Sequence, residues 1–320
     1  MKRFLLLALL ALPLLPACQF DAGVVACEDG TTPGPSPVPP ATLQELRQQL
    51  GAPAQSFTYD PTRVNTFTGA KGTVVTIAAG AFHRNGQPVA GPVPMHVREI
   101  LSRADMVLSA VPTVSNGQVL QSAGAVFVGP AQDSSLQLGS NSQIRLQVPT
   151  PPNVPRRDSM SLFVAPPATN ATACFNWLLN TTPGSFLRPT AAGNEIIIGN
   201  ALYNQGIRWF NCDRFYGTPA PVTITVNVPG SNIDPRRNTL VFAVFRAFNG
   251  ALQLCTFSPP NSFQASRLPL GQPISVVVIR TVDGKLYYGR QDGTAQAGQV
   301  FTPQLSETTT TALVANLNGL

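Results

Sequence analysis

Short apolar runs that alternate with polar residues occur from about Thr58 onward, and they constrain the fold more than any other feature. Alternation with a period of two is typical of half-buried β-strands, and the chain's 31 prolines further limit helix. The sequence therefore predicts an all-β fold. The clearest runs, rich in Val, Ile, Thr and Phe, are Thr73–Ile77, Val93–Ile100, Ile144–Val148, Val222–Val228, Thr239–Phe245 and Ile274–Val282.

Tight turns and helix signals complete this pattern. Asn-Gly and Asp-Gly pairs tolerate the positive φ angles of two-residue hairpins, and short helices are expected only near residues 42–50 and in the tail, 304–320. The predicted hairpin turns are Asn85-Gly86, Asn116-Gly117, Asn249-Gly250 and Asp283-Gly284.

An internal similarity recurs at an offset of 80 residues. The segments 144–149 and 224–229 share one pattern, and the proline-arginine-arginine segments that begin at Pro155 and Pro235 follow them at the same distance. Each copy continues into an apolar run. We interpret this as a strand, a loop and a strand occurring twice, either by duplication inside one sandwich or by convergence on a common loop chemistry. Two copies are too few for a solenoid.

These patterns predict the domain organisation. Two β-sandwich units are expected in tandem, at residues 58–150 and 151–303, followed by a C-terminal helix over 304–320. Residues 18–57 combine a proline-rich tether with the short helix, because proline-rich chain favours extended conformations that build no core.

The first 18 residues predict export. Lys2 and Arg3 precede an apolar run over residues 4–15, and Leu15-Pro16-Ala17-Cys18 closes the segment. This is typical of a secretory signal, here residues 1–17, and it is too short for a membrane span. The closing motif resembles the lipobox of bacterial lipoproteins, which implies a lipid on Cys18 and attachment to the cell envelope. We expect an outer-membrane lipid anchor with the face left open; an ordinary signal with a chance cysteine is the alternative.

Four further cysteines fit an oxidising compartment. Cys27, Cys174, Cys212 and Cys255 form no CxxC pair, so disulfides are favoured over a metal or redox centre. We predict a Cys174–Cys212 bond. Cys174 paired with Cys255, suggested by their similar repeat positions, and no bond at all are the alternatives. Whether Cys27 and Cys255 are paired stays open.

The predicted bond depends on strand register. Opposed residues of an antiparallel pair have a constant index sum, and one sum places Cys174 opposite Cys212 and Trp177 opposite Trp209. The register therefore requires these two segments to be direct neighbours in a sheet.

Charge and motif content argue against several function classes. Charged residues make up 11% of the chain, against about 25% in ordinary domains, and no basic cluster exceeds two residues, so nucleic acid is not an expected partner. The only histidines are His83 and His96, and no nucleophile elbow or metalloprotease motif occurs. We predict no catalytic residues, no metal and no cofactor. Glu99, Asp105 and Asp213 are better explained by structural ion pairs than by sugar hydrolysis.

Two sets of side chains are candidates for binding. Trp177, Trp209 and Tyr216 can form a ligand platform, with burial in the sandwich core as the alternative. The paired arginines of the two repeated loops can contact anions, with solvated loops as the alternative. These arginines are Arg156, Arg157, Arg236 and Arg237.

A stretch covering residues 72–138 resembles a known family. Its marks include Gly72-Thr73-Val74-Val75, Asn85-Gly86-Gln87-Pro88-Val89 and Arg98-Glu99-Ile100, and Trp209-Phe210-Asn211-Cys212 extends the likeness. The stretch is similar to uncharacterised surface lipoproteins of Gram-negative bacteria, and its opening resembles the β-sandwich module of ankyrins and netrin receptors. That module is a protein-interaction platform. The resemblance implies an interaction or scaffold role with an unknown protein or polysaccharide partner; glycan binding in nutrient capture and, more distantly, hydrolysis are the alternatives.

Overall fold

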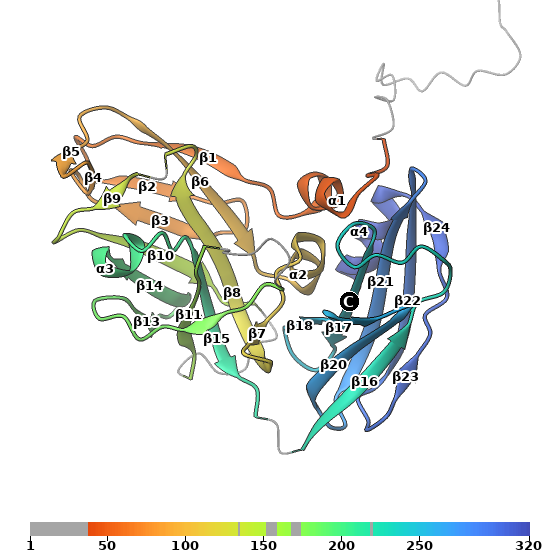
Figure 1. Cartoon of the computed structure of the whole chain (residues 1–320). Helices are drawn as coiled ribbons and strands as arrows, with labels where there is room; N and C mark the ends of the chain where they lie inside the picture. The colour runs from red at the N-terminus through yellow and green to blue at the C-terminus, as the bar shows by residue number, and fades with distance from the viewer. Residues whose placement is uncertain (1–37, 134, 152–158, 168–173, 218–219) are drawn as a thin grey trace, which may run out of the picture. The chain divides into compact units, whose positions relative to one another are not determined.

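The computed structural model describes residues 38–133, 135–151, 159–167, 174–217 and 220–320. Residues 39–320 form one compact unit. The predicted signal peptide, Cys18, Cys27, most of the tether, Arg156 and Arg157 lie outside the described residues. The all-β prediction is confirmed, because strands in several sheets dominate and the helices are short (Figure 1).

The first sandwich packs two antiparallel sheets around a common core. The larger sheet has the order β1 (Gln55–Tyr59), β6 (Val93–Ile100), β8 (Gln118–Pro130), β15 (Trp209–Phe215), β11 (Ser161–Ala165) and β12 (Leu178–Leu179), with β7 (Val114–Ser115) on β8. The smaller sheet has the order β13 (Phe186–Pro189), β14 (Gly193–Gly199), β10 (Gln143–Pro149), β3 (Val74–Ile77) and β2 (Asn65–Thr68). A minor sheet joins β5 (Gln87–Pro88), β4 (Phe82–Arg84) and β9 (Gln137–Leu138).

Alternation explains why these two sheets face each other. Val93, Met95 and Val97 of β6 are buried while their neighbours are less so, and β10 repeats the pattern with Ile144 and Leu146. Successive side chains point to opposite faces of a strand, so each sheet has one apolar face. Both apolar faces contribute to one cluster, which we call the first-sandwich core.

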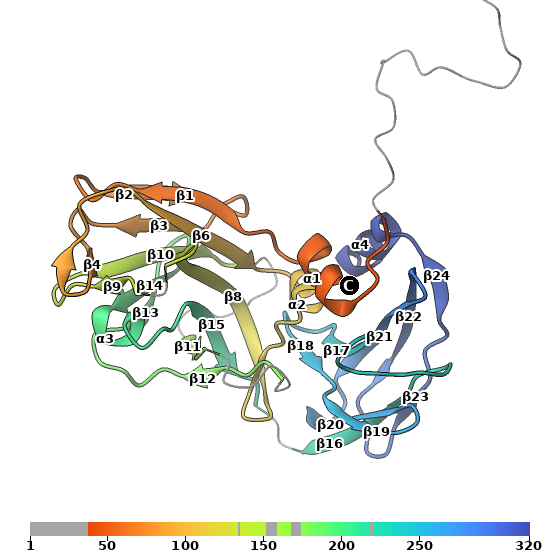
Figure 2. The same cartoon turned by 45° about the horizontal axis from the view of Figure 1, so that its top comes forward.

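The second sandwich is built from the later strands (Figure 2). One sheet has the order β19 (Thr256–Ser258), β20 (Ser262–Pro269), β16 (Pro221–Asn227) and β23 (Val300–Phe301), with β16 and β23 parallel. The other has the order β18 (Ala251–Gln253), β17 (Thr239–Phe245), β21 (Pro273–Val282), β22 (Lys285–Thr294) and β24 (Ser306–Thr308). Their facing sides form the second-sandwich core.

A third cluster, the middle core, joins the two sandwiches. Every residue of β17 is buried: Val241 and Ala243 face the second-sandwich core, while Phe242 and Val244 lie in the middle core. The first sandwich contributes residues such as Phe163 from the outer side of its larger sheet. Continuous apolar runs are typical of strands covered on both faces, and β17 is such a strand.

Three helices complete the middle core: α1 (Leu43–Leu50), α2 (Arg103–Ser109) and α4 (Thr310–Asn318). α1 and α4 confirm the two predicted helices, while α2 and α3 (Asn200–Tyr203) were not predicted. α2 begins at a capping box in which the Ser102 and Asp105 side chains each accept from the other's backbone N–H. Its seven residues are too short a run to show helical periodicity.

The predicted domain boundary at residue 150 is wrong. β10 ends at Pro149, but β11 and β14 follow it in sequence and belong to the same two sheets. The chain enters the second sandwich between Phe215 and Pro221. The repeated segments correspond to β10–β11 and β16–β17, and each copy passes from one sheet of its sandwich to the other. The copies therefore lie in different sandwiches, and not inside one.

Three of the four predicted hairpin turns are tight turns. Asn85, Asn116 and Asp283 have φ angles of 52°, 49° and 51°, and the glycine after each is also positive. These pairs connect β4 to β5, β7 to β8 and β21 to β22. The Asn249-Gly250 turn is different, because five residues separate β17 from β18, and neither residue has a positive φ.

Candidate functional site

The disulfide joins the two sandwiches. Cys174, just before β12, bonds to Cys255, between β18 and β19, with their Cα atoms 6.4 Å apart. Cys212 is a buried free thiol in the first-sandwich core, and its burial raises its pKa well above the usual value. The predicted Cys174–Cys212 bond is therefore wrong, and the alternative that followed from the repeat positions is found instead.

An intervening strand explains this error. β12 pairs with β11, and β11 pairs with β15, so Leu162 lies opposite Cys212. The constant index sum applies only to directly paired strands. Cys174 and Cys212 are on opposite sides of β11 and do not share a register.

A cleft of about 1280 Å³ surrounds the disulfide, and we call it the disulfide cleft. Residues of both sandwiches line it, including both cysteines and Asp234, which precedes β17. Two of the candidate binding residues, Trp209 and Arg236, are brought together here. Its aromatic lining residues are Phe127, Phe175, Trp209 and Phe257, and its basic ones are Arg47, Arg208 and Arg236.

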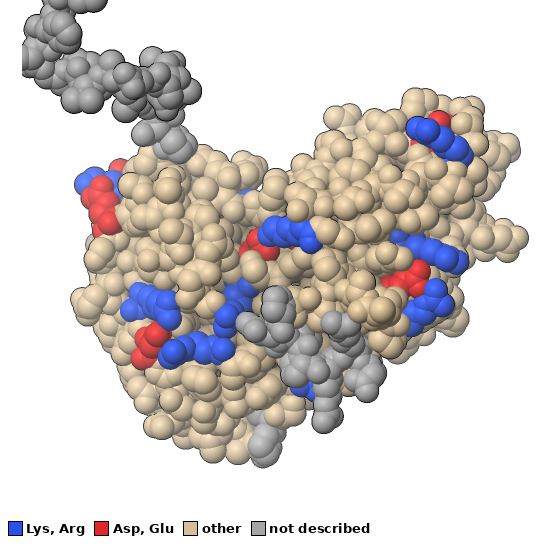
Figure 3. Space-filling view, turned by 180° about the vertical axis from the view of Figure 1, so that it is seen from behind, with Lys and Arg blue, Asp and Glu red and all other residues tan. Residues whose placement is uncertain are grey.

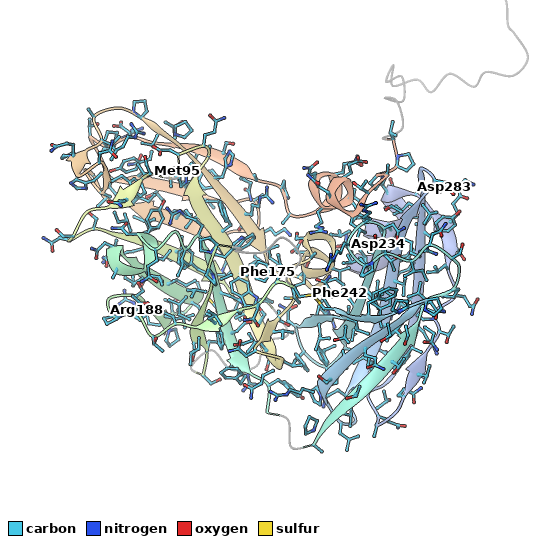
Figure 4. All side chains as sticks on the ribbon, in the orientation of Figure 1. Met95, Phe175, Arg188, Asp234, Phe242 and Asp283 are labelled. Carbon is cyan, nitrogen blue, oxygen red and sulfur yellow. A yellow bond between two sulfur atoms is a disulfide. The ribbon has the colours of Figure 1, made fainter. Side chains whose placement is uncertain are left out.

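The aromatic rings of the cleft pack edge to face. Trp209 lies 5.4 Å from Phe127, its partner across the β15–β8 pair, and 6.0 Å from Phe175, measured between ring centroids. The interplanar angles are 66° and 89°. Phe175 is partly buried against the middle core, to which Phe242 belongs (Figure 4). These contacts fix the rings in place while Phe127, Phe175 and Trp209 stay partly exposed.

The predicted aromatic platform is not a single surface. Trp177 is fully buried, and its indole N–H donates to the carbonyl of Pro112 at 2.9 Å. Its ring plane lies 83° from that of Trp209, so the two do not form one flat face. Tyr216 stacks on Phe248 at 4.1 Å, beside the second-sandwich core. Of the three candidates, the cleft contains Trp209 alone.

The arginines differ in how firmly they are held. Arg208 lies over the ring of Tyr203, 3.6 Å from its centroid, and donates to that residue's carbonyl at 2.6 Å; burial lowers its pKa. Arg236 is exposed on the loop before β17, and its backbone N–H donates to the Asp234 carboxylate at 2.8 Å. Arg237 is 3.9 Å from the same carboxylate and does not line the cleft. Of the two predicted arginines that the structure describes, only Arg236 belongs to the site.

The remaining polar candidates have structural roles. Burial alone would raise the pKa of Glu99, but hydrogen bonds from Gln55, Lys71 and Thr73 lower it overall. The bonds from the backbone N–H groups of Lys71 and Thr73 also tie the loop before β3 to β6. Asp105 caps α2. His83 and His96 are half-buried on β4 and β6.

Charge is thinly spread over the surface. On the face drawn in Figure 3, Lys, Arg, Asp and Glu side chains lie in small separate groups on a mostly uncharged background. Within the described residues, no group of three or more His, Cys, Asp or Glu is arranged to hold a metal ion. No helix in that part of the chain has the length and apolar character needed to cross a bilayer.

The sequence analysis did not identify five of the aromatic and basic lining residues, which are Phe127, Phe175, Phe257, Arg47 and Arg208. Phe127 becomes part of the site because it pairs with Trp209 across two strands that are distant in sequence. Arg208 and Arg47 carry no motif that marks them. Phe175 did have a signal, since it adjoins a cysteine in the repeated pattern.

Comparison with known protein families, with curated proteins and with solved structures finds no match to this chain. The resemblance drawn from residues 72–138 stays a prediction.

Proposed function

We propose that this chain is a lipid-anchored, non-enzymatic interaction module of the bacterial cell envelope that binds a partner in the disulfide cleft. The lining of the cleft supports this proposal most strongly, because the partly exposed rings of Phe127, Phe175 and Trp209 adjoin Arg208 and Arg236. Aromatic and arginine side chains are enriched among the residues that dominate binding energy at protein surfaces.

Preorganisation of the cleft also supports a binding role. The disulfide and the middle core hold its two walls, and backbone hydrogen bonds add to them: Thr113 donates to Ala251 at 2.8 Å and Ser122 to Asn249 at 2.9 Å. A site that is already ordered loses less conformational entropy when it binds.

Hydrolysis is less well supported by the same lining. Glycosidases use two carboxyl groups about 5–9.5 Å apart. Asp234 is the one carboxylate in the described lining, and it accepts the backbone N–H groups of Arg236 and Arg237.

Glycan binding is the second candidate. Partly exposed Trp209 and Phe175 in a cleft of about 1280 Å³ are compatible with stacking on sugar rings. The perpendicular Trp177 is a reason to rank this candidate second, because extended sugar platforms use coplanar rings.

Binding assays with cleft variants test the proposal. The full chain would be applied to an envelope protein extract with cross-linking and to a glycan array, alongside Trp209→Ala, Arg236→Gln and the control Arg63→Gln. The Arg63 side chain is 75% exposed, and its ion-pair partner among the described residues is Asp60. We expect Trp209→Ala to weaken binding about tenfold or more and the control to leave it unchanged. Partner binding that is indifferent to both cleft variants would contradict the proposed site.

Two further measurements test the rest of the proposal. Cys18→Ser should release the protein from membranes and remove the acyl mass that we expect on the wild type. A panel of glycans and esters should show no turnover. Reproducible turnover that one carboxylate or serine substitution abolishes would overturn the non-enzymatic role.

A further inference from the structure

A second cavity, of about 870 Å³, lies beside the first turn of α2, and we call it the arginine pocket. Its described lining shares no residue with the disulfide cleft. Arg103 of α2 and Arg246, which directly follows β17, enter it from the two sandwiches. Lys71 and Asp105 also line it.

Arg103 is held in place without a carboxylate partner among the described residues. Its Nη1 donates to the carbonyl of Phe245 at 2.9 Å and approaches that of Arg246 at 3.4 Å. Among the described residues, its Nε and Nη2 groups have no hydrogen-bond partner. Burial and then the positive charges of Arg246 and Arg290 lower its pKa, so like charges face one another here.

The local charge balance is positive. Lys71 pairs with Asp105, and Arg290 forms a fork on Asp292 with contacts of 2.7 and 2.9 Å. Arg246 lies 3.7 Å from the same Asp292 carboxylate, which it therefore shares. With Arg103 included, these side chains carry four positive and two negative charges, so the balance of the side chains is positive.

One residue of the lining also carries an uncharged donor. The hydroxyl oxygen of Thr150 is buried, has no hydrogen-bond partner in the described structure, and belongs to a lining residue. A buried hydroxyl without a partner loses free energy that a bound acceptor would restore.

We propose that the arginine pocket binds a phosphate-type dianion. The free edge of Arg103 fits two oxygens of a tetrahedral anion, Arg246 supplies a second charge, and the Thr150 hydroxyl donates to a remaining oxygen. The positive balance of these side chains favours a dianion over a monocarboxylate. Phosphate monoesters of sugars, phosphate lipid headgroups and free phosphate share this chemistry. The site is separate from the disulfide cleft and extends the proposed function.

Calorimetric titration of the full chain in detergent with inorganic phosphate at low salt tests this. We expect Arg103→Gln to weaken binding about tenfold or more, because it removes two charge-assisted hydrogen bonds, and Arg246→Gln to weaken it less. Arg63→Gln is the matched control and should bind as the wild type does. An absence of phosphate binding, or equal binding by Arg103→Gln, would overturn the proposal.

A variant that is expected to bind phosphate more tightly distinguishes loss of the site from loss of folding. Asp292→Asn removes the carboxylate shared by Arg246 and Arg290, so it should tighten phosphate binding several-fold, which misfolding cannot imitate. Unchanged or weaker binding by a folded Asp292→Asn chain would count against the site.

Three further titrations identify the source of the dianion. Glucose 6-phosphate binding more tightly than phosphate assigns a sugar phosphate, and soluble dihexanoyl phosphatidate doing so assigns a lipid headgroup. Phosphate binding most tightly assigns the free ion. Acetate binding as tightly as phosphate would overturn the dianion class. Trp209→Ala should keep phosphate binding even if the disulfide cleft proves to have no partner, so the two proposals fail independently.

Discussion

The first-sandwich core and the middle core are both completely buried, yet different sequence patterns build them. Met95 and Leu146 enter the first-sandwich core from strands that alternate. Phe242 enters the middle core from a strand in which every residue is buried, and Leu46 enters it from a helix. Alternation therefore builds one sandwich, whereas unbroken apolar strands and short helices mark the region that joins two.

Loss of a middle-core aromatic should have the largest effect. Phe242→Ala is expected to lower the free energy of unfolding by about 3–5 kcal/mol. Trp177 belongs to the middle core and Trp209 packs against it, so tryptophan fluorescence reports on the middle core and circular dichroism on both sandwiches. If the middle core couples the sandwiches, the denaturation midpoint measured by fluorescence and the one measured by circular dichroism fall together.

Phe263→Ala in the second-sandwich core is the matched control, because Phe263 is equally buried but lies away from the middle core. It should shift the tryptophan signal less than Phe242→Ala does. An unchanged tryptophan midpoint in Phe242→Ala would show that Phe242 does not stabilise the middle core.

Removal of the disulfide should come next. The double variant Cys174→Ser with Cys255→Ser should lose about 2–4 kcal/mol, since the bond closes a sequence separation of 81 residues. Urea denaturation of this variant should match that of the reduced wild type. A loss below about 1 kcal/mol would indicate that the middle core alone constrains the two sandwiches.

Helix α1 provides a smaller test of the same region. Leu46→Ala should cost about 2–3 kcal/mol, because Leu46 is fully buried in the middle core. Gln48→Ala, on the exposed face of the same helix, should change stability little. A chain that starts at Ala54 lacks α1, so comparing it with a chain that starts at Pro39 and keeps α1 tests the helix as a whole. Equal melting temperatures for the two would contradict the role assigned to Leu46.

The smallest expected effect is a change of stability per pH unit, and it is due to Asp213. This residue lies on the opposite face of β15 from Cys212. Burial raises its pKa well above the usual value, although hydrogen bonds with Ser122 and Asn211 oppose the shift. The unfolded chain ionises this group near pH 4 and the folded chain at higher pH, so its contribution to stability is lost as pH rises. The slope is at most about 1.4 kcal/mol per pH unit.

Asp213→Asn should remove that slope, which urea midpoints measured from pH 5 to 8 would detect. Asp283→Asn, in an exposed hairpin turn, should leave the slope as in the wild type. A wild-type slope that survives in Asp213→Asn would show that another group is responsible.

Much of the secondary structure could be predicted, but little of the candidate site. The alternating runs and the turns at Asn85, Asn116 and Asp283 correspond to strands and tight hairpins in the structure, because both depend on neighbouring residues only. The disulfide cleft contains Trp209 and Arg236 as candidates, but Phe127 joins them only through strand pairing.

Sequence patterns were enough to predict the β-rich class, the two helices α1 and α4, and the strand–loop–strand unit that occurs twice. Which strands are neighbours could be learned from the three-dimensional fold alone. The insertion of β11 between β12 and β15 separated Cys174 from Cys212, and the packing of the two sandwiches placed Cys174 beside Cys255. Local patterns fix the conformation of a segment. Sheet order depends instead on contacts between strands that are distant in sequence, and the apolar faces of these strands look alike in sequence.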